Sequence, residues 1–291
     1  MFLLSDLKRP QEFNRTKKEI MIYILLLLKD IIQIYSIMVK SKGNISKELF
    51  ISIISILLFS CSINQQKVSL KKIEGSPAYE NSSLEIKEIV RSDEKYNFSF
   101  DINDYDLGIQ TKKEFDYDLA NSDKGQHIHF ILNNGPYSAH YGENFDYELP
   151  DGNNVILAFL SRSYHESVKN PDAYILTQIG NSNQIDLDNE FLFYSRPKGT
   201  YEGLDTEKLL LDFYLVNTKL SPSGNKVRLT IKQETFPKGT AFHQFLIDSW
   251  NAYYIEGLDK GDVTIKLELI NKEGNLIETP FNPSERVVTL K

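Results

Sequence analysis

Two histidines alternate along one expected strand of this chain at a spacing that could hold a metal ion. His127 and His129 are separated by one apolar residue, so both side chains face the same side, about 6.5–7 Å apart. Residues 133–136, Asn-Asn-Gly-Pro, are typical of a turn. If the returning strand pairs in the register expected for a four-residue turn, His140 lies opposite His129. Three imidazoles on one face could bind zinc or copper, with an Asp or Glu from residues 108–123 completing the site.

A structural role for the same histidines stays open. An internal repeat in the sequence aligns His127 and His129 with Lys226 and Arg228, so these positions could simply be polar and outward-facing. The neighbouring expected strand also places apolar residues on that outer face, namely Val155, Leu157 and Phe159. A covered outer face would make the histidines buried hydrogen-bonding groups. Contact with a polar ligand is the third interpretation.

Basic residues form a second candidate site in an otherwise acidic chain. Arg162 and His165 follow one expected strand, and Arg196 and Lys198 follow another, so the four side chains could meet on neighbouring loops. The planar guanidinium of Arg matches carboxylate and phosphate groups. The sequence therefore indicates either an anion-binding site or a set of salt bridges between two domains.

The elements that must position these residues are strands. From residue 84 onward, runs of five to eight residues alternate apolar and polar side chains and are rich in aromatic and β-branched types. Gly, Asn, Asp and Pro separate the runs, which is typical of antiparallel sheets.

The two halves of this region match each other. Residues 98–102, 125–132 and 149–160 align with 211–215, 224–231 and 258–269, and their apolar positions agree. Agreement on one face is what a shared core requires. The chain is therefore predicted to be all-β, with two tandem immunoglobulin-like β-sandwiches at 84–180 and 191–291 and a linker at 181–190. A single large barrel is the alternative.

A secretory signal precedes these domains. Residues 49–60 are an apolar run that follows three lysines and ends at Cys61, the only cysteine. This run of twelve residues, nine of them apolar, is too short for a transmembrane helix, which needs about 20. The ending Leu-Phe-Ser-Cys at residues 58–61 resembles the lipobox of bacterial lipoproteins. This resemblance implies that Cys61 is lipidated and anchors the chain to a membrane of the bacterial cell envelope, for which we expect the outer membrane.

The signal also divides the N-terminal part of the chain. A natural signal starts at residue 38, which gives residues 38–60 as the signal peptide and 1–37 as a segment upstream of the true start. Residues 61–83 are then expected to be a tether. With Cys61 lipidated, no thiol remains for a disulfide or a cysteine nucleophile.

Composition argues against nucleic acid as a partner. Asp and Glu number 40 against 33 Lys and Arg, which gives a formal net charge of −7. Nucleic-acid binding requires clustered basic residues.

Four longer runs of sequence are also distinctive: KGQHIHFILNNGPYSAHY, LAFLSRSYHESVK, LFYSRPKGTYEG and YYIEGL. Together they resemble a group of Bacteroidetes-type envelope lipoproteins labelled phosphopeptide-binding proteins. The resemblance implies an envelope location and this architecture. The resemblance identifies no binding residue in this chain. Forkhead-associated domains bind phosphopeptides with a Ser-x-x-His element, and the corresponding run here, at residues 161–165, is one residue longer. Residues 235–245 depart from the group's shorter hairpin.

No nucleophile elbow, phosphate loop or HExxH motif is present in the sequence. The chain is therefore expected not to be an enzyme and to have no obligatory cofactor. The leading prediction is a lipid-anchored envelope protein that binds a peptide, a glycan or a protein or has a structural role. Metal binding through the histidines is the alternative, and an enzyme with an unrecognised site is the third possibility.

Overall fold

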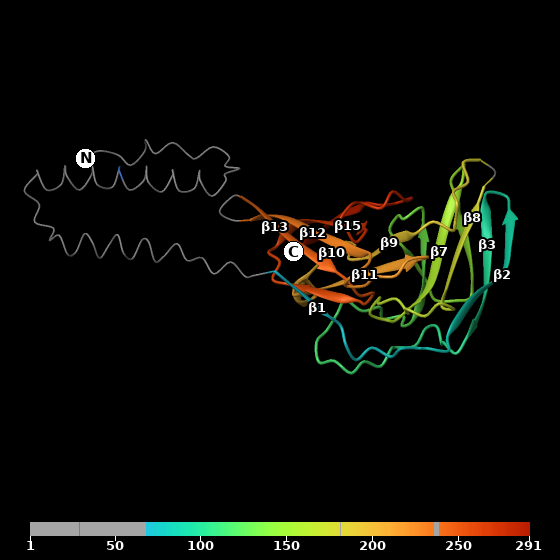
Figure 1. The fold of residues 1–291 in the computed structure, drawn as a ribbon. Helices are drawn as coiled ribbons and strands as arrows, with labels where there is room; N and C mark the ends of the chain where they lie inside the picture. The colour runs from blue at the N-terminus through green and yellow to red at the C-terminus, as the bar shows by residue number, and fades with distance from the viewer. Residues whose placement is uncertain (1–28, 30–67, 181, 236–238) are drawn as a thin grey trace, which may run out of the picture. The chain divides into compact units, whose positions relative to one another are not determined.

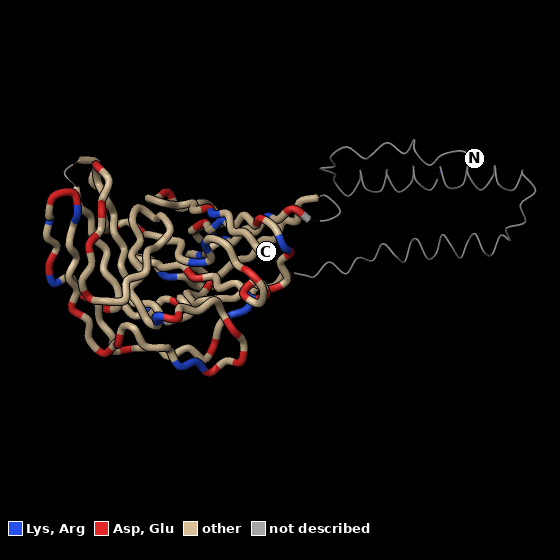
Figure 2. The backbone as a smooth tube through the Cα atoms, turned by 180° about the vertical axis from the view of Figure 1, so that it is seen from behind, with Lys and Arg blue, Asp and Glu red and all other residues tan. Residues whose placement is uncertain are grey.

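The structure is a computed structural model, and it describes residue 29 and residues 68–180, 182–235 and 239–291. Both sandwiches lie in one compact unit formed by Val68–Glu234 and Ala241–Lys291. Strands joined by turns and loops make up most of these residues (Figure 1). Figure 2 shows Asp and Glu positions spread over both sandwiches among the Lys and Arg positions. In the part of the chain that the structure describes, no helix is long and apolar enough to cross a membrane.

The first sandwich consists of two antiparallel sheets. One sheet has the order β2-β3-β6 and the other β5-β4-β7-β8. Their strands are β2 (Ser83–Ser92), β3 (Lys95–Asn103), β4 (His127–Leu132), β5 (Ser138–His140), β6 (Asn144–Glu148), β7 (Asn154–Ser161) and β8 (Tyr174–Ile179). Side chains that alternate onto the inner faces, among them Phe98, Phe130 and Ile156, form the core between the sheets.

The second sandwich repeats this plan with one strand added to each sheet. Its sheets have the orders β1-β14-β11-β9 and β10-β16-β15-β12-β13. The strands are β1 (Ser69–Lys72), β9 (Phe191–Arg196), β10 (Gly199–Tyr201), β11 (Lys208–Val216), β12 (Lys226–Thr235), β13 (Gly239–Ile247), β14 (Tyr253–Glu256), β15 (Gly261–Ile270) and β16 (Ser284–Leu290). A short 3-10 helix, η2 (Gly203–Thr206), precedes β11. Phe213, Leu229 and Leu267 are among the buried core residues.

The strand pairings agree with the internal repeat. In the first sandwich β3 pairs with β2 and β6, as β11 pairs with β9 and β14 in the second. Strand β4 lies between β5 and β7, as β12 lies between β13 and β15. Four separate sheets exclude the single large barrel. The predicted tandem immunoglobulin-like β-sandwiches are therefore confirmed.

The outer face of the first sandwich packs against the second sandwich. Val155, Leu157 and Phe159 on β7 share one buried cluster with Phe193 on β9 and Tyr214 on β11. The rings of Phe159 and Tyr214 stack with their centroids 4.6 Å apart. This joint explains why β7 is apolar on both faces, and it covers the face on which His127 and His129 lie.

A buried ion pair also crosses the joint, and sequence reasoning missed it. The ammonium of Lys169, in the loop before β8, lies 2.6 Å from a carboxylate oxygen of Asp212 on β11. The Asp212 side chain is fully buried and also accepts a hydrogen bond from the hydroxyl of Ser167 at 2.9 Å. Residues 182–190, from the predicted linker, run between β8 and β9.

The tether predicted for residues 61–83 is wrong over its described part. Strand β1 pairs with β14 in the second sandwich, and the flanking Val68 and Ile73 are buried. The pattern was missed because β1 has only four residues and two of them are lysines. The predicted signal peptide, its upstream segment and the lipidation site Cys61 lie outside the described residues.

Candidate metal centre

Strand alternation places two histidines of β4 on the covered face. His127 and His129 are two residues apart, so both side chains leave β4 on the side away from its sandwich core. Both are fully buried, whereas the intervening Ile128 packs into the core of the first sandwich. The histidine face is covered because the second sandwich packs on β4 and β7. The hydroxyl of Ser195 on β9 lies 3.3 Å from His129 Nδ1.

A third histidine reaches the same place from the loop after β7. The backbone N–H of His165 donates to the carbonyl of Arg162 at 2.8 Å, and an isolated bridge joins Ser161 to Ser167. His165 has a left-handed backbone with φ at 68°, which is uncommon for a residue other than glycine. This tight turn directs the imidazole of His165 back over β4. A strained backbone held in this way often marks a functional position.

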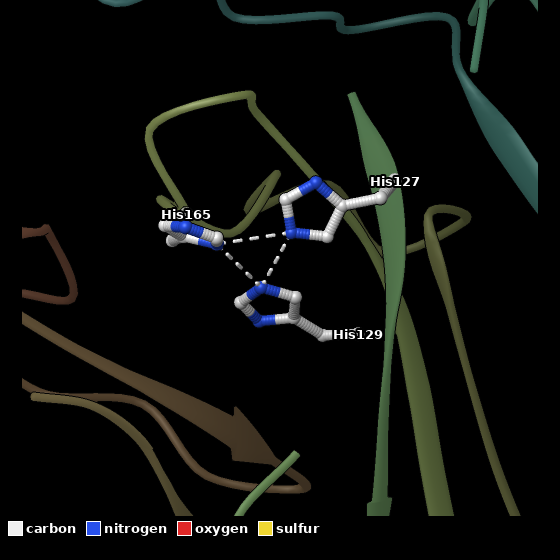
Figure 3. A group of neighbouring side chains, drawn as sticks. All are labelled: His127, His129 and His165. Atoms are coloured by element: carbon white, nitrogen blue, oxygen red, sulfur yellow. Dashed lines mark hydrogen bonds between the residues drawn. The ribbon is translucent and has the colours of Figure 1, made fainter. Parts of the chain in front are cut away.

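The three imidazoles converge through their ring nitrogens (Figure 3). His129 Nε2 lies 2.9 Å from His127 Nε2 and 3.5 Å from His165 Nδ1, and the third distance, between His127 Nε2 and His165 Nδ1, is 3.1 Å. A tetrahedral metal ion bonded to nitrogens at about 2.0–2.1 Å would hold them roughly 3.3 Å apart. The triangle therefore matches three corners of a metal coordination shell.

The second nitrogen of His127 sets the tautomer that metal binding needs. His127 Nδ1 lies 2.8 Å from the carbonyl oxygen of Gly125, so this nitrogen carries the proton and Nε2 keeps its lone pair. Histidines that bind metals commonly donate their other N–H to such an acceptor. His129 Nδ1 has Ser195 in the equivalent place. When both Nδ1 atoms carry the proton, the two Nε2 lone pairs face each other across 2.9 Å, an arrangement that favours a cation between them.

Burial keeps these imidazoles neutral, which is the form that binds metals. Burial, opposed by the hydrogen bond to Gly125 and assisted by the positive charges of Arg196 and Lys198, lowers the pKa of His127 to about 4. Burial likewise lowers the pKa values of His129 and His165. The site thus has its lone pairs available at neutral pH.

The expectation that His140 lies opposite His129 is wrong. In the structure His129 pairs with Ala139, and His140 pairs with Ile128. Asn133 and Asn134 both adopt left-handed backbone conformations, and the turn is one residue shorter than expected. A shift of one residue moves a side chain to the other face of a strand. His140 consequently faces the core side of the first sandwich, where it is partly buried and stacks on Phe145 with centroids 3.4 Å apart.

The internal position of His140 predicts a pH-dependent stability. Burial lowers its pKa from 6.5 to about 4, so between these values the unfolded chain binds a proton that the folded chain excludes. The free energy of unfolding should therefore fall as the pH falls through this window, and this contribution is fully present above pH 6.5. In urea unfolding at pH 7 and pH 5, His140→Phe should show a smaller loss of stability than the wild type. An unchanged loss would contradict the burial of His140.

The insertion at residues 108–123 supplies no metal ligand in this structure. Among the described residues, the histidine triangle is the only group of three or more His, Cys, Asp or Glu with a geometry that could hold a metal ion. The insertion instead packs over the His165 loop, where Leu119 and Tyr164 share a buried cluster. A backbone hydrogen bond of 2.8 Å from Ser122 to Ser163 joins the two loops.

The basic residues separate into two groups. Arg162 is used inside the first sandwich, where its guanidinium lies 3.3 Å from the carboxylate of Glu166 and donates to the carbonyls of Pro77 and Ser167. It is 4% exposed, so it has no surface to offer a ligand. Arg196 has no carboxylate partner among the described residues. The interpretation of the two arginines as inter-domain salt bridges is wrong, because the carboxylate partner of Arg162 is Glu166 in the same loop and the ion pair that crosses the joint is Lys169–Asp212.

Arg196 and Lys198 surround Tyr137, which follows the β4–β5 turn. Lys198 Nζ lies 3.6 Å from the centre of the Tyr137 ring and donates a hydrogen bond to the backbone carbonyl of Tyr137 at 2.6 Å. The Arg196 guanidinium lies 5.2 Å from the centre of the same ring. The hydroxyl of Tyr137 is 3.1 Å from His165 Nδ1. Burial, together with the charges of Arg196 and Arg286, lowers the pKa of Lys198 to about 8.

The structure thus joins members of both predicted sites in one cluster. It brings together His127, His129, His165, Arg196 and Lys198, and it leaves out His140 and Arg162. Sequence reasoning assigned His165 to the basic site and missed it as a partner of the β4 histidines. The signal that could have found it is the pairing of β4 with β7, because His165 follows β7 at the end where His127 lies.

The comparisons with known proteins show no family for this chain. No family model and no curated protein matches the chain. A solved structure of Clostridium thermocellum CbhA fibronectin(III)-like modules is similar over 72% of this chain and 94% of its own, with 12% identity and a TM-score of 0.24. A tetra-tandem repeat from the extending region of a large adhesion protein is similar over 72% and 49%, with 12% identity and a TM-score of 0.21. TM-scores this low carry no conclusion about function.

Proposed function

We propose that this chain is a lipid-anchored envelope protein that binds one transition-metal ion, zinc or copper, at the joint between its two sandwiches. The observation that carries the proposal is the triangle of ring nitrogens from His127, His129 and His165, with edges of 2.9, 3.1 and 3.5 Å. Imidazole suits zinc and copper, whereas calcium and magnesium prefer oxygen ligands.

Burial also supports a specific site. Histidines on a protein surface can bind metal ions adventitiously. His127 and His129 are instead fully buried, and their Nδ1 atoms contact the carbonyl of Gly125 and the hydroxyl of Ser195. A preformed shell reduces the reorganisation that binding requires. His165 is partly exposed and gives the ion a route to the site.

The role is non-catalytic binding in this proposal. The leading prediction from sequence, a peptide, glycan or protein ligand held by Arg162, His165, Arg196 and Lys198, loses support because Arg162 is committed to internal contacts. The other three residues adjoin the proposed metal. The metal alternative now has the stronger support.

Direct metal analysis tests the proposal. The full chain, purified in detergent, would be stripped with a chelator, equilibrated with zinc or copper(II), desalted and measured by mass spectrometry under native conditions. We expect one ion per chain. A chain that stays metal-free at micromolar zinc and copper would overturn the proposed function.

Anchoring is tested separately through Cys61. If this residue is lipidated, wild-type chain expressed in a bacterium should fractionate with membranes, and Cys61→Ala should remove the lipid and release most of the chain. Mass spectrometry of the wild-type N-terminal peptide should show acyl chains on Cys61. A Cys61→Ala chain that stays in the membrane fraction would contradict the anchor.

A further inference from the structure

The oxygen of Tyr137 stands at the rim of the histidine triangle. Its hydroxyl lies 3.1 Å from His165 Nδ1, a spacing within the range that the three ring nitrogens keep among themselves. Its ring lies flat against His129, with centroids 3.5 Å apart and planes 13° from parallel. The phenol oxygen of Tyr137 therefore lies beside the histidine triangle, next to the Nδ1 corner that His165 provides.

Among the described residues, no carboxylate at this site balances the positive charge that a bound metal ion would bring. A divalent ion on three neutral imidazoles adds two charges to those of Arg196 and Lys198, and no Asp or Glu joins the metal-binding group among the described residues. Arg196 is 8% exposed, its Nε has no hydrogen-bond partner there, and it pairs with no carboxylate. Buried charge of one sign is costly unless an anion lies within reach.

Tyr137 can supply that anion. We propose that its phenol oxygen is the fourth metal ligand, bound as a phenolate whose charge is balanced by Arg196 and Lys198. This inference rests on the proposed metal site. On binding, the O–H bond of Tyr137 breaks, a metal–oxygen bond forms, and the proton leaves to solvent, with no change in oxidation state.

The arrangement around the ring fits this role. His129 occupies one face of Tyr137, so Lys198, at 3.6 Å from the ring centre, occupies the other. The attraction between a cation and the face of a neutral phenol ring is weak. A phenolate carries a full negative charge and would attract both Lys198 and Arg196 directly. This explains why two basic side chains gather on one tyrosine.

Ser161 is the competing oxygen. Its hydroxyl lies 3.1 Å from His129 Nε2, as close to the triangle as Tyr137. A serine hydroxyl loses its proton far less readily than a phenol, and Ser161 has the carbonyl of Arg162 as an alternative acceptor at 3.3 Å. We therefore assign the fourth position to Tyr137.

Copper(II) is the probe that tests this assignment, because a phenolate bound to it gives a visible charge-transfer band. The full chain loaded with one equivalent of copper(II) should show the band, and resonance Raman excitation within it should enhance tyrosine ring vibrations. Tyr137→Phe should bind one copper ion without the band and at least about tenfold more weakly. The matched control Tyr141→Phe, whose hydroxyl bonds to Ser122, should keep the band.

Each outcome decides the assignment. Stoichiometric copper without the band in the wild type, or a band that persists in Tyr137→Phe, would overturn the tyrosine ligand and leave the histidine site intact. A wild-type chain that binds no copper would overturn both this inference and the proposed function. The Raman signature of the wild type reads the ligand directly, so the assignment does not depend on the folding of the variant.

Discussion

His129→Ala is expected to abolish stoichiometric binding of zinc and copper. His129 Nε2 contacts both of the other cluster nitrogens, at 2.9 Å to His127 and 3.5 Å to His165, so its loss leaves two histidine ligands instead of three. Removal of outer-shell partners already weakens metal binding about 10- to 100-fold, and removal of a direct ligand should cost more than about 100-fold. Isothermal titration with zinc, with bound metal counted by mass spectrometry, measures this loss.

The matched control is His140→Ala. His140 belongs to the same hairpin but faces the core of the first sandwich, so its loss should leave the metal stoichiometry at the wild-type value. Because alanine at the fully buried His129 leaves a cavity, His165→Ala provides a second test at a partly exposed position. Unchanged affinity in His129→Ala and His165→Ala, or a loss confined to His140→Ala, would refute the triangle as the binding site.

Asp212→Ala is expected to lower the free energy of unfolding by about 3 kcal/mol, the low end for a broken buried ion pair. The Asp212 side chain is fully buried and accepts from Lys169 at 2.6 Å and from the Ser167 hydroxyl at 2.9 Å. Its removal leaves the Lys169 charge without a carboxylate at the joint between the sandwiches. The low end applies because Lys169 retains 14% exposure and can turn toward water.

Urea unfolding followed by tryptophan fluorescence measures this change, since Trp250 packs in the same joint. Asp101→Ala is the control, because Asp101 pairs with Lys87 at the surface with both side chains more than half exposed. An exposed pair of this kind is worth about 0–1 kcal/mol. Equal losses in the two variants would show that the Lys169–Asp212 pair does not hold the joint.

The sequence predicted the architecture because the two halves share their apolar positions. Strand alternation alone placed His127 and His129 outward on β4, and outward Val155, Leu157 and Phe159 indicated that this face is covered. The structure adds what covers it, namely β9 and β11 of the second sandwich.

The ligand set required information that strand periodicity does not contain. His140 changes faces with the length of one turn, and Asn-Asn-Gly-Pro does not specify whether three or four residues form it. His165 reaches the site through the backbone of a tight loop with a left-handed residue. Strand β1 was too short and too basic to separate from a tether.

The structure of the metal-loaded chain tests the central claim most directly. Anomalous diffraction at the copper or zinc edge should locate one ion bonded to His127 Nε2, His129 Nε2 and His165 Nδ1 at about 2.0–2.1 Å. An ion bound elsewhere, with the three imidazoles still in contact with one another, would contradict the account.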